Sequence, residues 1–298
     1  MPRAVSRPRL AFVVSTYEAP RPLDAVLRGF AEQSDRDFEL VVADDGSGPD
    51  TKAVVDDWRS TFASRLTHVW QPDEGFRLAR VMNLGALAVD ADYLVFLHGE
   101  SIPRRRLVRA IRTCMKPGWF VAGRRVNLSR QLTARVLEQE LPVHRWGLPR
   151  WIRARAVGNI GELAALTDRD RRRVGKVGVP EFVPRNRSYG YLLGVERGYF
   201  ERVNGYDTRF VGWGEEDVDI ALRLGRLGLR CGQPGPDGTL IHLWHESNVP
   251  RERPNWYLLQ ETERSDRIDA IEGLREQARA ARGGTGWLGP GGTRRLAV

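Results

Sequence analysis

The chain has 298 residues, of which 41% are hydrophobic and 29% charged, and it carries a formal net charge of +9. This composition suits a globular protein with a substantial core, because no apolar run approaches the ~18 residues of a membrane span and two cysteines, Cys114 and Cys231, are too few for a disulfide framework. The positive charge calls for an acidic partner, and the absence of the usual recognition motifs argues against nucleic acid.

Strands and helices alternate at the start of the chain. Leu10–Ser15 is a continuous apolar run typical of a strand covered on both faces, and Leu23–Phe30 carries a helical apolar face. A second such strand, Phe38–Ala43, precedes a helix over Pro49–Ser60. This order predicts an α/β fold with a mostly parallel central sheet flanked by helices.

Polar residues follow the first two strands, at the sheet edge where ligands bind in such folds. Thr16 and Glu18 follow the first strand, and Asp44 and Asp45 follow the second. The sequence Asp-Asp-Gly-Ser also suits a turn with a helix cap, so a binding role and a structural role both stay open.

The next two strands add further candidates. After a strand over Thr67–Trp70, Arg77 lies at a helix start, where it could meet a phosphate or form a surface salt bridge. The strand Tyr93–Leu97 then delivers His98 and Glu100 into the same cleft, which fits a metal-binding corner.

Residues 124 to 187 hold 15 Lys and Arg against 6 Asp and Glu, a surplus equal to that of the whole chain. We expect an inserted acceptor-side region here, although the run Arg169–Arg173 also suits a solvated face. A strand is expected over Tyr189–Val195 and a turn over Glu201–Asp207.

The stretch Phe210–Asp219 gathers four carboxylates, a tryptophan and two glycines. Helical spacing behind it predicts a helix that begins near Glu215 and places the acids in its first turn. Complementing the helix dipole accounts for one or two acids only. Trp213 beside carboxylates suits a sugar, which needs an apolar platform for its ring and a base for a hydroxyl proton.

A short strand over Thr239–Glu246 contains His242 and His245. Residues three apart face opposite sides of an ideal strand, so both reach one metal only if the strand ends between them. A structural role for each histidine is the alternative. The tail predicts a polar helix over Gln260–Arg282 and disorder from Gly283 onward.

Together these stretches resemble glycosyltransferase family 2, on the nucleotide-diphospho-sugar transferase fold called GT-A, which is Rossmann-like. The second half resembles the galactosyltransferase-type carboxyl domain of chondroitin-polymerase-like and β-1,4-galactosyltransferase-like enzymes. The motifs that carry the resemblance are Val203–Asp207, Gly212–Asp217, and Gly75–Arg77 with Asn83 and Gly85 downstream. The resemblance implies four parts: a nucleotide-sugar-binding half (1–123), a basic acceptor-side insertion (124–187), a catalytic half (188–259), and a polar helix with a disordered tail (260–298).

The resemblance also implies site residues. The donor, a UDP-sugar, would contact Thr16, Glu18, Asp44, Asp45, Arg77, Asn83 and His98. The family's Asp-x-Asp metal corner falls on His98-Gly99-Glu100, so this chain departs from the pattern at His98. Glu100 and His245, or else His242, would bind Mn²⁺ or Mg²⁺.

The reaction implied is inverting transfer of a hexose, of the galactose or N-acetylhexosamine type, to a carbohydrate or lipid-linked acceptor. Asp217 would be the base, while Glu216, Trp213, Gly214 and Glu215 would bind and orient the sugars. Two alternatives stay open: a catalytically weak nucleotide- or carbohydrate-binding relative, and a protein that binds an anionic surface. We expect a cytoplasmic protein with peripheral contact at the inner membrane face.

Overall fold

The computed structural model describes residues 8–167, 191–246, 253–283, 287–289 and 293–295. A nine-stranded sheet runs through the centre, in the order β11-β12-β3-β2-β1-β4-β8-β6-β9. Its strands are β1 (Leu10–Thr16), β2 (Glu39–Asp44), β3 (Leu66–Trp70), β4 (Tyr93–His98), β6 (Trp119–Ala122), β8 (Leu192–Glu196), β9 (Arg230–Gly232), β11 (Trp287–Gly289) and β12 (Thr293–Arg295).

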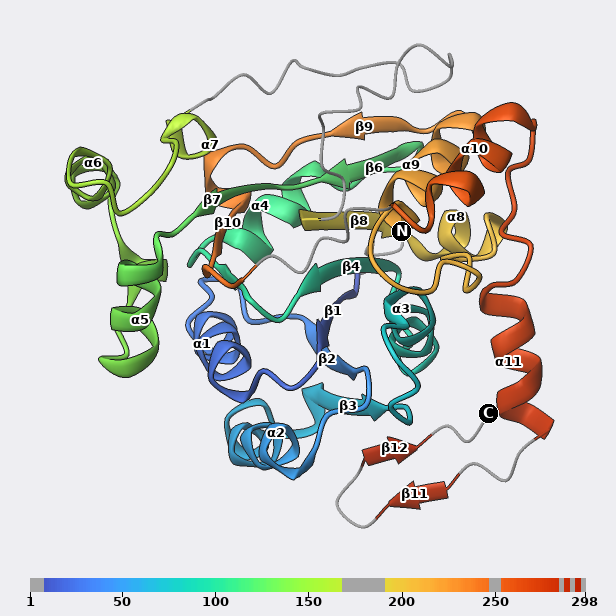
Figure 1. Cartoon of the computed structure of the whole chain (residues 1–298), viewed down its shortest axis with the longest axis horizontal. Coiled ribbons are helices and arrows are strands. Elements are labelled where there is room, and N and C mark those ends of the chain that lie inside the picture. The colour runs from blue at the N-terminus through green and yellow to red at the C-terminus, as the bar shows by residue number, and fades with distance from the viewer. Residues whose placement is uncertain (1–7, 168–190, 247–252, 284–286, 290–292, 296–298) are drawn as a thin grey trace, which may run out of the picture.

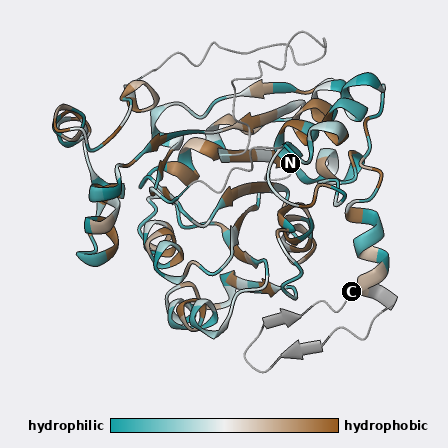
Figure 2. Cartoon of the chain, in the orientation of Figure 1, coloured by the Kyte–Doolittle hydropathy of each residue, from teal (hydrophilic) through white to brown (hydrophobic). Residues whose placement is uncertain are grey.

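The predicted α/β fold with a mostly parallel sheet is confirmed. β3, β2, β1 and β4 are parallel neighbours, whereas β8 pairs antiparallel with both β4 and β6. The apolar runs of β1 and β2 are buried along almost their whole length, as expected for strands covered on both faces. In Figure 2 the central strands are accordingly brown, while the outer helices carry much teal.

Helices cover both faces of this sheet (Figure 1). One hydrophobic core lies under α1 (Pro20–Ala31), α2 (Pro49–Phe62) and α4 (Leu107–Cys114). The other lies under α3 (Leu78–Leu87), α8 (Arg197–Arg202) and α9 (Glu216–Arg226). Among the described residues, no helix combines the length and apolarity needed to cross a lipid bilayer.

A second, smaller sheet lies beside the first. Its order is β5-β10-β7, formed by Ser101–Pro103, Thr239–His242 and Arg124–Asn127, with β10 antiparallel to β5 and parallel to β7. After β7 come α5 (Arg130–Glu138), α6 (Leu148–Ala156) and α7 (Ala164–Thr167). The predicted basic run Arg169–Arg173 lies outside the described residues, and the four-part division of the chain stays a prediction.

The predicted single helix over Gln260–Arg282 is wrong. The structure has two helices, α10 (Trp256–Arg264) and α11 (Leu274–Gly283). Between them, the backbone N–H groups of Ala270 and Ile271 donate to the Val203 carbonyl and the Asp207 carboxylate instead of to a helix. The disorder expected from Gly283 onward falls largely on residues outside the described ones, and the described residues 287–289 and 293–295 form the short strands β11 and β12.

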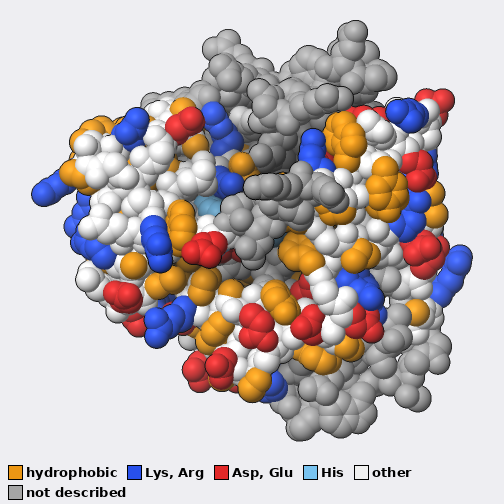
Figure 3. Space-filling model, in the orientation of Figure 1, with side chains coloured by type: hydrophobic (Ala, Val, Ile, Leu, Met, Phe, Trp, Pro, Cys, Tyr) orange, Lys and Arg blue, Asp and Glu red, His pale blue; other side chains and the backbone are white. Residues whose placement is uncertain are grey.

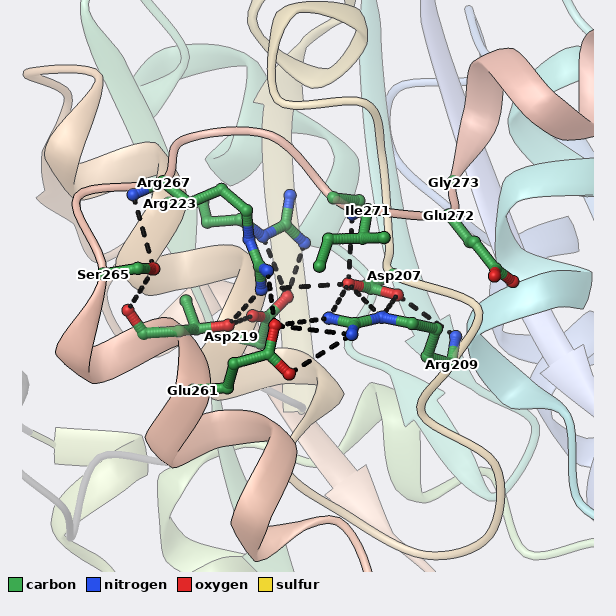
Figure 4. A network of polar contacts seen from close by, with 12 residues as sticks. Asp207, Arg209, Asp219, Arg223, Glu261, Ser265, Arg267, Ile271, Glu272 and Gly273 are labelled. Carbon is green, nitrogen blue, oxygen red and sulfur yellow. Dashed lines mark hydrogen bonds and ion pairs between the residues drawn. The ribbon is translucent and has the colours of Figure 1, made fainter.

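A buried ion pair holds α9 against this C-terminal segment. Asp219 and Arg223 are fully buried, joined at 2.6 Å, and Arg223 also donates to the carbonyls of Val203 and Gly205. Thr262 of α10 donates to the other Asp219 oxygen at 2.7 Å. Figure 4 shows this pair beside further ion pairs that link the same segments.

Replacing Asp219 by Asn should lower the free energy of unfolding by about 3–5 kcal/mol, because the Arg223 guanidinium would stay buried without its counter-charge. Urea denaturation measures this loss. The matched control is Asp269→Asn, since Asp269 pairs with Arg275 at 2.6 Å on the half-exposed surface. That change should cost under about 1 kcal/mol. Equal losses in the two variants would contradict the prediction.

Candidate active site

The parallel register of the central strands brings several predicted residues to one edge of the sheet. Thr16 lies opposite Asp44 of β2, and Ser15 lies opposite His98 of β4. The Thr16 hydroxyl is buried and has no hydrogen-bond partner among the described residues. This edge therefore presents a polar atom that can take a ligand.

A small pocket next to this edge is lined by Tyr17, Asp45, Gly75 and Phe76. The Asp45 carboxylate accepts from the Arg77 backbone N–H at 2.8 Å and from the Gln71 amide. Burial raises the pKa of Asp45, and these hydrogen bonds oppose that rise. The carboxylate is thus held in a defined position, with exposed aromatic rings of Tyr17 and Phe76 beside it.

Glu18 connects the loop after β1 to the loop after β2 by hydrogen bonds at the same edge of the sheet. Its carboxylate accepts from the Gly48 N–H at 2.8 Å, and its own N–H donates to the Ser47 hydroxyl at 2.9 Å. Arg77 forms an ion pair with Glu74 at 2.6 Å, so the structure shows the surface salt bridge that was its alternative interpretation.

Two residues that were predicted to contact the donor, Asp44 and Asn83, form hydrogen bonds inside the protein. Asp44 is 1% exposed, and its oxygens bond His68 at 3.0 Å and the Ser47 N–H at 2.8 Å. Asn83 is fully buried, and its side-chain amide bonds both the carbonyl and the N–H of Tyr206. These hydrogen bonds hold loops in place, and a donor contact at Asp44 or Asn83 stays a prediction.

Glu100, His242 and His245 form a cluster whose potential ligand atoms lie within 4.8 Å of one another. β10 ends at His242, which meets the condition that the strand end between the two histidines. His98 is not in this cluster, and its Nδ1 lies 3.2 Å from the Ser15 hydroxyl. The three side chains of the cluster are the predicted metal ligands, Glu100 with His245 and His242, whereas the suggested corner of His98 with Glu100 is not formed among the described residues.

The protonation states in this cluster suit a metal. Burial raises the pKa of Glu100, but His242, whose Nε2 lies 3.6 Å from the carboxylate, and the nearby His98 and His245 outweigh it and lower the pKa to about 2. Burial lowers the pKa of His242. An ionised carboxylate with a neutral imidazole is the form that binds a cation. One carboxylate oxygen and two imidazole nitrogens make a fitting donor set for a divalent transition ion.

The predicted helix start near Glu215 is confirmed, since α9 begins at Glu216. Three contacts hold the loop before it. The Gly212 N–H donates to the Phe76 carbonyl at 2.8 Å, Asn255 donates to the Gly214 carbonyl at 2.9 Å, and Arg253 pairs with Glu215. Between them Trp213 is 42% exposed and available to a ligand.

Glu216 and Asp217 form a carboxyl pair at the start of α9. Burial, and then the charge of Asp217, raise the pKa of Glu216 well above its usual range. Burial also raises the pKa of Asp217, but the charge of His98 favours its ionised form. Asp217 therefore ionises first, beside a protonated Glu216 whose buried Oε2 has no partner among the described residues.

One residue of this region was missed at the sequence level. Arg125 on β7 stacks its guanidinium 3.8 Å from the centre of the Tyr191 ring, and its buried Nε has no partner among the described residues. Its charge acts on both Glu100 and His242. The only sequence signal was its place in the basic segment, because the pairing of β7 with β10 is a long-range contact.

Comparisons with known proteins find glycosyltransferases that are similar in sequence. Residues 11–128 match the model of glycosyl transferase family 2, and residues 175–246 match a model described as the N-terminal domain of galactosyltransferase. Validoxylamine A glucosyltransferase of Streptomyces hygroscopicus subsp. jinggangensis is 29% identical over 77% of this chain and 54% of its own length. Chondroitin synthase of Pasteurella multocida is 25% identical over 72% of this chain and 23% of its own length. The chain thus spans about half the length of the first relative.

Solved structures show the same fold. The S. aureus TarS 1-349 complex with UDP aligns with a TM-score of 0.58 at 10% identity, over 92% of this chain and 70% of that one. A mannosyltransferase from Pyrobaculum calidifontis, in complex with GDP-Man and Mn²⁺, aligns with a TM-score of 0.51 at 20% identity, over 94% of this chain and 66% of that one. The predicted resemblance and the GT-A fold are confirmed. Residues 11–128 are therefore similar to glycosyl transferase family 2, residues 175–246 are similar to the galactosyltransferase model, and the fold is that of GT-A glycosyltransferases.

Proposed function

We propose that the protein is an inverting glycosyltransferase that moves a hexose from a UDP-sugar to a hydroxyl of a carbohydrate or lipid-linked acceptor. The observation that carries this proposal is the placement of Asp217. His98 influences the pKa of both Asp217 and Glu100, which supports a site shared by the start of α9 and the Glu100–His242–His245 cluster. A base together with a cation site suits attack by the acceptor and departure of the diphosphate at a single carbon.

Asp217 takes the proton from the acceptor hydroxyl as that oxygen attacks the anomeric carbon from the face opposite the diphosphate. The new bond forms to the acceptor oxygen, and the bond to the diphosphate oxygen breaks with its electron pair. Glu216, held protonated, can donate a hydrogen bond to a sugar oxygen, and the exposed Trp213 offers its face to a sugar ring.

The pocket of Tyr17, Asp45, Gly75 and Phe76 receives the nucleoside. The Asp45 carboxylate accepts a base N–H, and the aromatic rings cover the base. The unpaired Thr16 hydroxyl is a further donor contact. The UDP in the S. aureus TarS complex supports this choice of nucleotide, and the GDP-Man in the mannosyltransferase complex makes GDP-mannose the donor to compare with it.

Glu100, His242 and His245 would hold a divalent ion, whose Lewis acidity stabilises the negative charge of a departing nucleoside diphosphate. Two imidazoles favour Mn²⁺ over Mg²⁺, which prefers oxygen ligands. Arg125, next to this cluster, adds a fixed positive charge for the same diphosphate.

The stereochemistry can be tested with the donor alone. Slow hydrolysis of an α-linked UDP-hexose, followed by proton NMR before the sugar mutarotates, should first release the β-anomer. First release of the α-anomer would refute the inverting mechanism.

Activity should fall as the pH is lowered, with a midpoint above the ordinary aspartate pKa of about 3.9. The sign follows from burial, which raises the pKa of Asp217, so that the basic form is lost as the pH falls through that raised value. Initial rates of transfer between about pH 4.5 and 8 measure this acidic limb of the pH–rate profile. Glu216→Gln should keep the limb because Gln resembles protonated Glu216. Rates that rise toward acid pH would contradict the assignment.

A further inference from the structure

Helix α6 (Leu148–Ala156) projects at one end of the molecule, next to α5 (Figure 1). It is fixed to the protein by one side only. Trp151 is fully buried, its ring centre lies 5.0 Å from that of Trp146, and its indole N–H donates to the Trp146 carbonyl at 3.1 Å. Ala154 is buried on the same side. Because this side is held by packing, the opposite side stays turned to solvent.

The solvent side carries aliphatic side chains that nothing in the described chain covers. Leu148 is 44% exposed, Ile152 is 51% exposed and Val157, just after the helix, is 63% exposed. Leu148 and Ile152 are four residues apart, so they stand one above the other on the same face. A single exposed aliphatic residue is common, but Leu148 and Ile152 stacked on one helix face, with Val157 exposed just beyond the helix end, indicate contact with an apolar phase.

Arginines flank this aliphatic row. Arg150, Arg153 and Arg155 are exposed, and none of them forms an ion pair with a residue that the structure describes. Arg145 just before the helix is different, since it pairs with Glu32. No Asp or Glu occurs between Trp146 and Gly161. In Figure 3, blue side chains project from this end of the molecule.

We propose that α6 docks the protein on an anionic lipid surface, with Leu148, Ile152 and Val157 entering the interface and Arg150, Arg153 and Arg155 among the headgroups. A short helix with an aliphatic face, flanking arginines and no acid has the composition of helices that lie in a membrane interface. Nucleic acid would use the arginines but leave the aliphatic row in water. The proposal does not depend on the proposed reaction, because none of these residues belongs to the active site.

The test is co-sedimentation of the full chain with vesicles of phosphatidylcholine that contain roughly 40% phosphatidylglycerol. This anionic lipid gives the vesicle surface a negative potential. The wild-type protein should bind these vesicles and should bind pure phosphatidylcholine at least about ten-fold more weakly. Each arginine near an anionic surface adds roughly five-fold in affinity, so R150Q/R153Q/R155Q should lose about 100-fold. Ile152→Ser should also lose affinity, and its exposed position keeps the fold intact.

The matched control, R36Q/R202Q/R264Q, removes the same charge from exposed arginines on other elements and should keep binding within about three-fold. Equal loss in both triple variants would mean that net charge alone acts, and would overturn the proposal. No binding to anionic vesicles, or tighter binding to a DNA duplex that the α6 variants abolish, would also overturn it. Nucleotide release without acceptor should be unchanged in every α6 variant, so a failure of the proposed reaction is seen separately.

Discussion

Replacing Asp217 by Asn should reduce sugar transfer by about 10²–10⁴-fold while leaving the affinity for UDP within about two-fold of wild type. The amide keeps the shape of the side chain but cannot accept the proton of the attacking hydroxyl. Burial raises the pKa of Asp217, so its ionised form costs energy in the folded state, and the neutral amide should not destabilise the protein. Transfer rates and calorimetric titration with UDP measure the two effects.

Asp269→Asn makes the same chemical change on the half-exposed surface and should leave both quantities unchanged. Asp45→Asn should show the opposite pattern to Asp217→Asn, with weaker UDP binding, because Asp45 lines the nucleoside pocket. If Asp217→Asn lost UDP affinity, Asp217 would be a donor contact. If it kept its rate, the base would have to be another residue.

The second large effect is expected at the metal-binding cluster. Glu100→Gln removes the carboxylate among the three clustered side chains and should weaken Mn²⁺ binding and metal-stimulated nucleotide release by about 100-fold or more. His242→Ala and His245→Ala should each weaken Mn²⁺ binding as well. Electron paramagnetic resonance of free Mn²⁺ measures the affinity directly, without any acceptor or turnover.

Glu246→Gln is the matched control, because Glu246 adjoins His245 but contributes only its backbone carbonyl to that ring. It should bind Mn²⁺ like wild type. Unchanged Mn²⁺ affinity in Glu100→Gln would show that the cluster is not the metal site. If Glu100→Gln lost Mn²⁺ affinity but neither histidine variant did, the ion would be bound by the carboxylate without the histidines.

The sequence was most informative where the signal was local. The buried strands β1, β2 and β4 follow from continuous apolar runs, and the start of α9 follows from helical spacing behind the acids of Phe210–Asp219. The proposal that Asp217 and Glu100 serve one site follows from the strand ends and from the motif order that the family resemblance implies.

Other assignments depended on contacts between distant segments. Asp44 and Asp45 are adjacent and chemically alike, yet His68 turns Asp44 inward while the Arg77 N–H holds Asp45 at the pocket. No local pattern distinguishes them. The same holds for Asn83, whose amide is engaged by Tyr206, 123 residues further along the chain.

The histidine pair shows a similar limit. Whether His242 and His245 both reach one metal depends on where β10 ends, and β10 ends where its pairing with β5 and β7 ends. The break between α10 and α11 also depends on contacts between distant segments. Backbone N–H groups that a continuous helix would bond internally donate instead to oxygens of the turn Val203–Asp207.

The most direct test of the proposed function is release of nucleotide from a panel of nucleotide-sugars by the purified chain, with Mn²⁺, with Mg²⁺ and with a chelator. We predict release of UDP from one UDP-hexose, stronger with Mn²⁺ than with Mg²⁺, and lost in both Asp217→Asn and Glu100→Gln. Release of GDP from GDP-mannose instead would keep the enzyme class and change the donor. Absence of release from every donor, together with no binding of UDP or GDP, would contradict the proposal.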